Sequence, residues 1–239
     1  GLDDAVRVFP AHGAGSACGK NLSTERQSTI GAQRLTNYAA RPMSQEKFIE
    51  LVTEGQPAAP GYFVYNATLN RKLRDLREPD EAHPALSVAE ADAELAAGAV
   101  LVDARPPAEY ATGALSGSIN IGADGRFAEN VGSVLKPTDR VVVLAPAGLG
   151  EDTCMRLERI GYDNCAGHLA DGEAFLLSHS DRVSPVSRLT VAQFDEVRTN
   201  PEVQVVDIRN AGELEVNGKV PGTRHIPLAE LVKRSDELD

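Results

Sequence analysis

The sequence lacks any apolar run near the roughly 18 residues that a membrane-spanning helix needs. It has few cysteines: Cys18, Cys154 and Cys165 are an odd number without paired spacing, so neither a disulfide framework nor a zinc site is predicted. We interpret each as a buried small apolar residue. Basic residues are also scarce, since 24 Lys and Arg against 35 Asp and Glu give a net charge of -11. This balance argues against a nucleic-acid or anionic-membrane partner.

No signal-peptide pattern opens the chain, so we expect a cytoplasmic protein. With 239 residues and 42% hydrophobic content, the chain can bury one large or two ordinary cores. It starts at Gly1 rather than at Met and stops one helical turn after an apolar run. We therefore expect it to be a piece of a longer protein.

An internal repeat is the strongest signal in the sequence. Residues 86–121 align with residues 189–226, and the offset between the copies drifts only from 103 to 105. Both copies begin with a predicted capping box, Ser87 with Glu90 and later Thr190 with Gln193. An apolar strand follows in each and ends in Asp-x-Arg. The matched polar residues are Asp103, Arg105 and Glu109 in the first copy, and Asp207, Arg209 and Glu213 in the second.

Helix and strand alternate through the first copy, which predicts an α/β domain with a largely parallel sheet flanked by helices. We assign residues 86–182 to one complete domain and residues 189–239 to the front half of a second. Residues 1–80 differ: a strand and a Gly-rich loop are followed by predicted helices starting at Thr24 and Ser44, an extended segment at 55–63 and a charged linker at 71–84. This segment must complete an upstream domain or pack on the next one.

One strand-loop-helix in the first copy has the outline of an anion site. Residues 141–144 are predicted as a buried strand, residues 145–150 as a tight loop, and residues 151–160 as a helix ended by Gly161. Unpaired amides at a helix start point into such a loop and can hold an anion. Yet no Ser, Cys, Lys or His stands between Leu144 and Gly150, so the loop lacks a nucleophile.

These features resemble the rhodanese (sulfurtransferase) family twice over. The segments VDARPPAEYATGALSGSINI and VDIRNAGELEVNGKVPGTRHIP are similar to the family's Asp-x-Arg, Glu and Gly-His-Ile-Pro-Gly-Ala pattern, and the strand-loop-helix completes it. The resemblance covers residues 86–239. Ala114 and Lys219 depart from it, because each stands where the family usually has His.

The N-terminal stretch VFPAHGAGSACGK resembles the last metal-region strand of the metallo-β-lactamase fold, and more closely that of persulfide dioxygenases. The order of segments is similar to that of bacterial persulfide dioxygenase–rhodanese fusion proteins. For the parent, this implies oxidation by O2 of a low-molecular-weight persulfide such as glutathione persulfide. The reaction would use a mononuclear non-haem iron and give sulfite, and rhodanese transfer would make thiosulfate.

The resemblance also implies where the iron belongs. It would be held by residues upstream of this segment, so we expect no cofactor in this chain. His12 is the best single candidate for metal chemistry, near the iron site rather than a ligand of it. Assembly into a homo-oligomer stays open.

Rhodaneses carry sulfur on a Cys-x-x-Gly-x-Arg loop, where a thiolate acts as nucleophile. Here Ala145 takes the place of the cysteine, Gly148 fits, Gly150 replaces the arginine, and Glu151 adds a charge that opposes an anionic persulfide. We predict an inactive, evolved pseudo-domain, in which Glu151 stabilises the helix start. Ala147 and Leu149 would be the remaining binding residues of the loop.

Two groups of residues have a structural interpretation that we favour. The Asp, Arg and Glu triplets of both copies are predicted as ion-pair networks that fix a chain connection. Cys154 shares a helix face with Leu157 and Gly161, so a packed thiol is favoured over a substitute nucleophile.

Two alternatives remain. One is a non-catalytic module whose pocket binds an anion or a partner, and the other is a true sulfurtransferase that uses Cys154 or Cys165. The repeat spacing places the counterpart of Ala145 at roughly position 250, where an active second unit would carry its cysteine.

Overall fold

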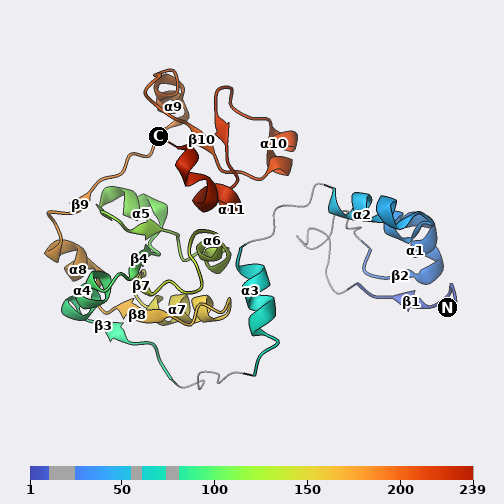
Figure 1. The fold of residues 1–239 in the computed structure, drawn as a ribbon, viewed down its shortest axis with the longest axis horizontal. Helices are drawn as coiled ribbons and strands as arrows, with labels where there is room; N and C mark the ends of the chain where they lie inside the picture. Colours follow the sequence, from blue (N-terminus) through green and yellow to red (C-terminus); the bar gives the residue numbers. More distant parts are fainter. Residues whose placement is uncertain (11–24, 55–60, 74–80, 239) are drawn as a thin grey trace. The chain divides into compact units, whose positions relative to one another are not determined.

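The computed structural model describes residues 1–10, 25–54, 61–73 and 81–238, in two compact units. The first unit comprises Gly1–Ala58 and Ala211–Gly218, and the second comprises Ala59–Asn210 and Lys219–Asp239. Figure 1 traces the elements of both along the chain. In the described residues no helix is both long and apolar enough to cross a bilayer.

The first unit is small and mostly helical. Strands β1 (Arg7–Val8) and β2 (Ser28–Thr29) pair in antiparallel fashion, and helices α1 (Ile30–Thr36), α2 (Gln45–Thr53) and α10 (Ala211–Asn217) accompany a short 3-10 turn, η1 (Tyr38–Ala40). Ser44 caps α2 as predicted, by accepting a hydrogen bond from the Lys47 amide. The helix predicted to start at Thr24 is wrong in position: Thr24 lies outside the described residues, and α1 starts at Ile30 because the Thr29 hydroxyl caps it.

The second unit contains a five-stranded sheet in the order β3-β8-β7-β4-β6, with every pair parallel. Its strands are β3 (Ala85–Leu86), β4 (Val100–Asp103), β6 (Ile119–Asn120), β7 (Val141–Leu144) and β8 (Cys165–Leu169). The helices between them are α4 (Val88–Ala96), α5 (Pro107–Thr112), α6 (Phe127–Val134) and α7 (Gly150–Glu158), and α8 (Gly172–Ser178) follows the last strand, β8. A short antiparallel pair, β5 (Ala114–Leu115) with β9 (Val183–Ser184), adjoins this fold. The predicted α/β architecture with a parallel sheet and flanking helices is confirmed.

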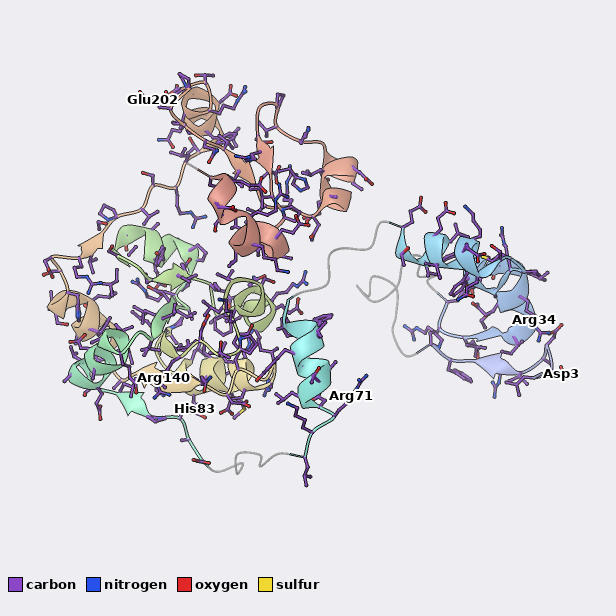
Figure 2. All side chains as sticks on the ribbon, in the orientation of Figure 1. Asp3, Arg34, Arg71, His83, Arg140 and Glu202 are labelled. Carbon is purple, nitrogen blue, oxygen red and sulfur yellow. The ribbon has the colours of Figure 1, made fainter. Side chains whose placement is uncertain are left out.

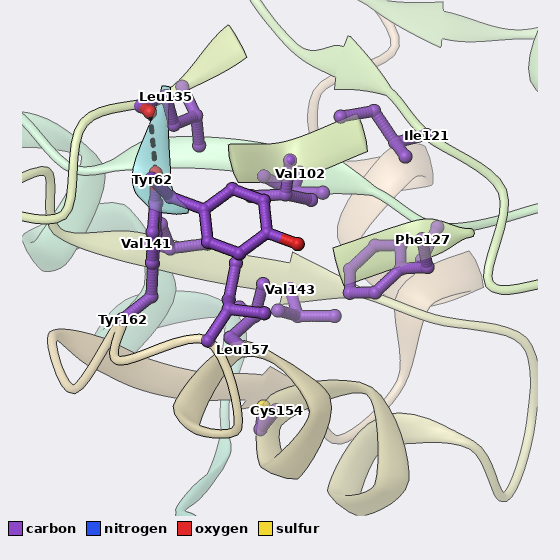
Figure 3. Packing of buried hydrophobic residues seen from close by; sticks show 13 residues of the cluster. Tyr62, Val102, Ile121, Phe127, Leu135, Val141, Val143, Cys154, Leu157 and Tyr162 are labelled. Carbon is purple, nitrogen blue, oxygen red and sulfur yellow. Dashed lines mark hydrogen bonds between the residues drawn. The ribbon is translucent and has the colours of Figure 1, made fainter. Parts of the chain in front are cut away.

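Strand β7 divides the core into two layers because its side chains alternate between the faces of the sheet. Val141 and Val143 join a cluster with Phe127 of α6 and Leu157 of α7, shown in Figure 3. Val142 and Leu144 join a second cluster with Ala91 of α4 and Phe175 of α8. All four β7 residues are buried, so the strand lies between helices on both faces.

Helix α3 (Tyr62–Leu69) corrects the extended structure predicted for residues 55–63, since Tyr62 and Phe63 open a helix. Tyr62 is buried in the cluster under α6, where its ring occupies the space that a side chain at Gly132 would need. A Cβ at Gly161 would likewise stand only 2.8 Å from Cδ2 of Leu69 in α3. The sheet unit therefore includes a helix that precedes residue 86, the start of the repeat.

The second copy of the repeat forms α9 (Val191–Val197), β10 (Val206–Asp207), β11 (Arg224–His225), α11 (Leu228–Leu231) and η2 (Val232–Glu237), with α10 between the strands. Both predicted capping boxes are present, on α4 and on α9. The apolar stretch 203–206 is strand only from Val206 onward. Strands β10 and β11 pair in parallel, and Asp207 stands opposite His225 as Asp103 stands opposite Asn120. The repeat is thus one of structure as well as of sequence.

Candidate functional site

The loop between β7 and α7 opens onto a cavity of about 600 Å³, which we call the Ala145 pocket. Its lining residues come from the carboxyl ends of β4, β7 and β8 and from the loops that follow, as expected for a parallel sheet. Gly148 has a φ of +78°, which the tight turn requires. The lining residues are Arg105, Glu109, Leu144, Ala145, Pro146, Ala147, Gly148, Gly150, Glu151, His168, Leu169, Ala170, Asp171, Gly172, Glu173 and Leu176.

The Ala145 pocket offers no thiol, hydroxyl or amine among the described residues that line it. Of the predicted loop residues, Ala147 lines the pocket, whereas Leu149 does not and is 42% exposed. Nothing in this lining resembles the thiolate that sulfur transfer requires.

The charge of the pocket opposes an anionic ligand. Among the described residues of its lining, Glu109, Glu151, Asp171 and Glu173 supply four carboxylates and Arg105 supplies one guanidinium. That guanidinium is already engaged, because its Nε and Nη2 donate to the Asp103 carboxylate and Nη2 also donates to the Gly113 carbonyl. A thiosulfate or persulfide anion would therefore meet a negative field.

Glu151 at the start of α7 is held by His83, a residue that sequence reasoning missed. Its carboxylate accepts hydrogen bonds from the His83 backbone N–H at 2.8 Å and from the ring Nδ1 at 2.9 Å. Burial alone would raise the pKa of Glu151, but these bonds from His83 outweigh burial and lower the pKa. Because the partners lie 68 residues apart, only the fold brings them together.

The His83 imidazole lies between the carboxylates of Glu151 and Glu158. Its side chain is fully buried beside α7 (Figure 2), and Nε2 lies 3.0 Å from Glu158 Oε1, although outside hydrogen-bond geometry. Glu151 and Glu158 stand seven positions apart on α7, so both carboxylates project from one face of the helix. These contacts of His83 connect α7 to the segment that precedes β3.

Gly150 is a glycine because His168 occupies the space beside it. A Cβ at Gly150 would stand 2.3 Å from His168 Nδ1, well inside contact distance. The position where the resemblance calls for an arginine therefore has no room for a side chain. The His168 imidazole, which also lines the Ala145 pocket, was not anticipated from the sequence.

The Asp-x-Arg motif of the first copy forms a buried ion pair. Asp103 is 0% exposed and accepts from the Arg105 amide at 3.0 Å, from Nε at 2.9 Å and from Nη2 at 2.5 Å. Asn120 donates to the Asp103 and Arg105 carbonyls and so joins β6 to the same connection. Glu109 forms no ion pair with any described residue and lines the pocket instead.

The second copy builds the same connection in a more open setting. Arg209 donates to Asp207 from its amide, its Nε and its Nη2, and His225 Nε2 lies 2.8 Å from the Arg209 carbonyl, in the place of Asn120. Hydrogen bonds from the Arg209 side chain lower the pKa of Asp207 to about 2. Glu213 lies in the first turn of α10.

Cys154 is fully buried on α7, on the side that faces the strands (Figure 3). Leu157 is buried in the same cluster, as the packed-thiol interpretation requires. Cys165 at the start of β8 is partly exposed and packs against that cluster.

The described residues do not supply a site for iron. Outside the segments 11–24, 55–60 and 74–80, no three His, Cys, Asp or Glu side chains gather in a way that could hold a metal ion. His12, the predicted neighbour of a metal centre, lies outside the described residues, as does Cys18.

The sheet order, the loop after β7 and the buried Asp-Arg connection identify one part of the chain. The family model described as "Rhodanese-like domain" matches residues 87–173. This part of the chain is a rhodanese-like domain. The Ala145 pocket lies at the carboxyl edge of its sheet.

Three solved structures are similar to the chain that contains the rhodanese-like domain. A metallo-beta-lactamase from Staphylococcus aureus subsp. aureus COL matches 70% of this chain at 30% identity, with a TM-score of 0.54, and the chain spans 45% of that protein. The thiosulfate sulfurtransferase from Pseudomonas aeruginosa matches 65% of the chain and 36% of its own length at 22% identity, with a TM-score of 0.32. The Alr3790 protein from Anabaena sp. matches 49% of the chain and 96% of its own length at 14% identity, with a TM-score of 0.38. No curated protein sequence matches the chain.

Proposed function

We propose that the rhodanese-like domain does not transfer sulfur and that the chain is the C-terminal portion of a persulfide dioxygenase–rhodanese fusion. In this proposal residues 1–80 end a metallo-β-lactamase-like domain, and residues 189–239 begin a second rhodanese-like domain. The upstream part would hold iron and oxidise a low-molecular-weight persulfide such as glutathione persulfide. The degenerate domain between them would act as a structural spacer.

The lining of the Ala145 pocket carries the proposal of inactivity. Ala145 ends the strand where a nucleophile would stand, and the described lining contains no thiol to replace it. His168 fills the space at Gly150, and four carboxylates surround the loop. Several independent features therefore oppose an anionic sulfur donor, which a single engineered substitution would not produce.

The extent of one structural match supports the fusion. The metallo-beta-lactamase from Staphylococcus aureus matches 70% of the chain, about 167 residues, which is about twice the length of segment 1–80. A protein bearing that name thus shares part of the rhodanese-like region as well. This extent is what a fusion of the two domain types would give.

Inactivity is tested by assaying the 239-residue chain for thiocyanate formation from thiosulfate and cyanide. We expect the rate in buffer alone, because no described residue of the pocket can carry the sulfur. A second sample with Cys154→Ser serves as the matched control. Thiocyanate formation above the buffer rate that this substitution abolishes would overturn the proposal.

The fusion is tested on the full-length protein rather than on this chain. We expect it to bind iron and to consume O2 when glutathione persulfide is added. Elemental analysis of the 239-residue chain is the companion measurement, and we expect no stoichiometric iron or zinc. About one metal per chain, lost on His12→Ala, would show that the metal site lies here instead.

The acidic lining favours a second candidate, a pocket that binds a neutral or basic group of a partner. Titrating isotope-labelled chain with thiosulfate or with an arginine-rich peptide separates the two ligand classes by NMR. Shifts of the Gly148 and Gly150 amides with the peptide alone would support partner binding. Shifts with thiosulfate alone would restore the anion site.

A further inference from the structure

A second cavity lies beside the first residues of β4, and the proposed function does not use it. We call it the Leu101 pocket. Its volume is about 410 Å³, and among the described residues its lining shares no member with that of the Ala145 pocket. The lining comes from α4, β4, the turn after β5 and the end of α8, and Figure 1 shows α4 and α8 side by side. The volume falls within the range of ligand pockets, about 300–1,000 Å³.

The inner wall of the Leu101 pocket is apolar. Leu101 and Leu115 are each 3% exposed and belong to the core cluster that packs under α4 and α8. Leu95 and Ala99 are partly buried against the same cluster and also line the pocket. A hydrocarbon group placed against this wall would be removed from water, so its binding is favourable.

The rim of the Leu101 pocket carries the positive charge of Arg182. Among the described residues Arg182 forms no ion pair, and its Nη2 donates to the Ser116 carbonyl at 3.3 Å. The Ser116 amide in turn donates to the Arg182 carbonyl at 2.9 Å, which extends the β5–β9 pair. The fold thus holds the guanidinium beside Ser116. Because a guanidinium has several N–H donors and this contact occupies one of them, the others are open to a ligand.

The one carboxylate in the described lining of the Leu101 pocket is that of Asp92, and it is engaged by His179. Asp92 Oδ1 lies 2.9 Å from His179 Nε2. His179 is fixed at the end of α8, because its Nδ1 lies 2.8 Å from the Phe175 carbonyl and its ring centroid lies 4.5 Å from that of Phe175. Asp92 is therefore held at the imidazole rather than at the Arg182 guanidinium.

The two pockets of the rhodanese-like domain differ in charge. The described lining of the Ala145 pocket has four carboxylates, and its guanidinium is already bound to Asp103. The described lining of the Leu101 pocket has one engaged carboxylate and an arginine without a carboxylate partner. An anion is therefore favoured at the Leu101 pocket and disfavoured at the Ala145 pocket. The apolar inner wall further selects an anion that carries a hydrocarbon group.

We propose that the Leu101 pocket binds a small carboxylic acid with a short hydrocarbon chain. The chain lies against Leu101 and Leu115, and the carboxylate accepts hydrogen bonds from the Arg182 guanidinium, whose planar shape matches that of a carboxylate. The exposed Ser116 hydroxyl next to Arg182 donates a further bond. This inference goes beyond the proposed function, because it concerns a cavity that the sulfur chemistry does not use. It holds whether or not the chain belongs to a fusion protein.

The test is an NMR titration of the isotope-labelled 239-residue chain with hexanoate. Hexanamide, which keeps the chain without the charge, and acetate, which keeps the charge with almost no chain, are the matched ligands. We expect saturable shifts of the Ser116, Gly117 and Ser118 amides with hexanoate, and binding of either matched ligand that is weaker by about tenfold or more. Absence of saturable shifts would overturn the proposal. Shifts of the Gly148 and Gly150 amides instead would also overturn it, because they would place hexanoate in the Ala145 pocket.

Two arginine variants separate recognition at the rim from a general effect of charge. Arg182→Gln should weaken hexanoate binding by about tenfold or more, because it removes the cation from the rim. Arg188 is an exposed arginine outside the described lining, so Arg188→Gln is the matched control and should leave binding unchanged. The amide spectrum of each variant shows whether it is folded. Hexanoate binding that survives Arg182→Gln, or that weakens equally in both variants, would contradict the assignment.

Discussion

In the first copy of the repeat, Asp103 ends a strand with parallel neighbours on both sides, β6 and β7. In the second copy, Asp207 ends a strand that pairs with β11 alone among the described residues. Both aspartates bind the arginine two positions on through the same three donor groups. The motif is therefore local, and the neighbours of the strand decide how deeply it is buried.

The exposed fractions show this difference directly. The Asp103 and Arg105 side chains are 0% and 14% exposed, whereas those of Asp207 and Arg209 are 10% and 37% exposed. A buried ion pair is costly to break, since one charge is left uncompensated, while an exposed pair contributes little. The same Asp-Arg pair thus contributes differently to stability in the two copies.

The largest expected effect comes from substituting the buried aspartate. Asp103→Ala should reduce the free energy of unfolding of the sheet unit by about 3–5 kcal/mol, because Arg105 would be left buried without its partner. Asp207→Ala is the matched control and should cost much less. Urea unfolding monitored by hydrogen exchange in β4 and β10 measures both. Equal losses at the two positions would show that burial does not set the difference.

Alanine substitutions at two glycines should change stability by smaller amounts and in opposite directions. Gly150→Ala should destabilise the rhodanese-like domain by about 1–3 kcal/mol, because the new Cβ would collide with His168. Gly212→Ala lies in α10 with no atom within 4 Å of its Cβ and should stabilise that helix by roughly 0.5–1 kcal/mol. Thermal unfolding of both variants provides the comparison. A neutral Gly150→Ala would mean that His168 can turn away.

The smallest effect concerns the pH dependence of the second copy. Hydrogen bonds from Arg209 hold the pKa of Asp207 at about 2, below its usual 3.8. A carboxyl group whose pKa is lower in the folded protein than in the unfolded chain stabilises the fold at pH values above the unfolded-state pKa. This stabilisation is lost as the pH falls towards the folded-state pKa. We therefore expect protection of the β10 and β11 amides to decline between about pH 4 and pH 2. Asp207→Asn should flatten this decline, and an unchanged profile would contradict the assignment.

Much of the sheet unit follows from the sequence because its signals are local. The apolar stretch of β7, the capping boxes of α4 and α9 and the stop of α7 before Gly161 are each encoded within about a dozen residues. The absence of a nucleophile at Ala145 also follows directly from the sequence, because the residue type at a position does not depend on the fold. Helix α3 was not predicted, because its residues follow a Pro- and Gly-rich stretch that is typical of extended chain.

The sequence by itself determined the repeat, the α/β alternation and the absence of a nucleophilic side chain from the Ala145 loop. Tertiary structure alone decided that His83 would reach Glu151 and that His168 would fill the space at Gly150. The physical reason is the same for both pairs. Parallel strands are joined by long crossovers, so the side chains that meet at a strand or helix come from distant segments, and no local pattern records which will pair.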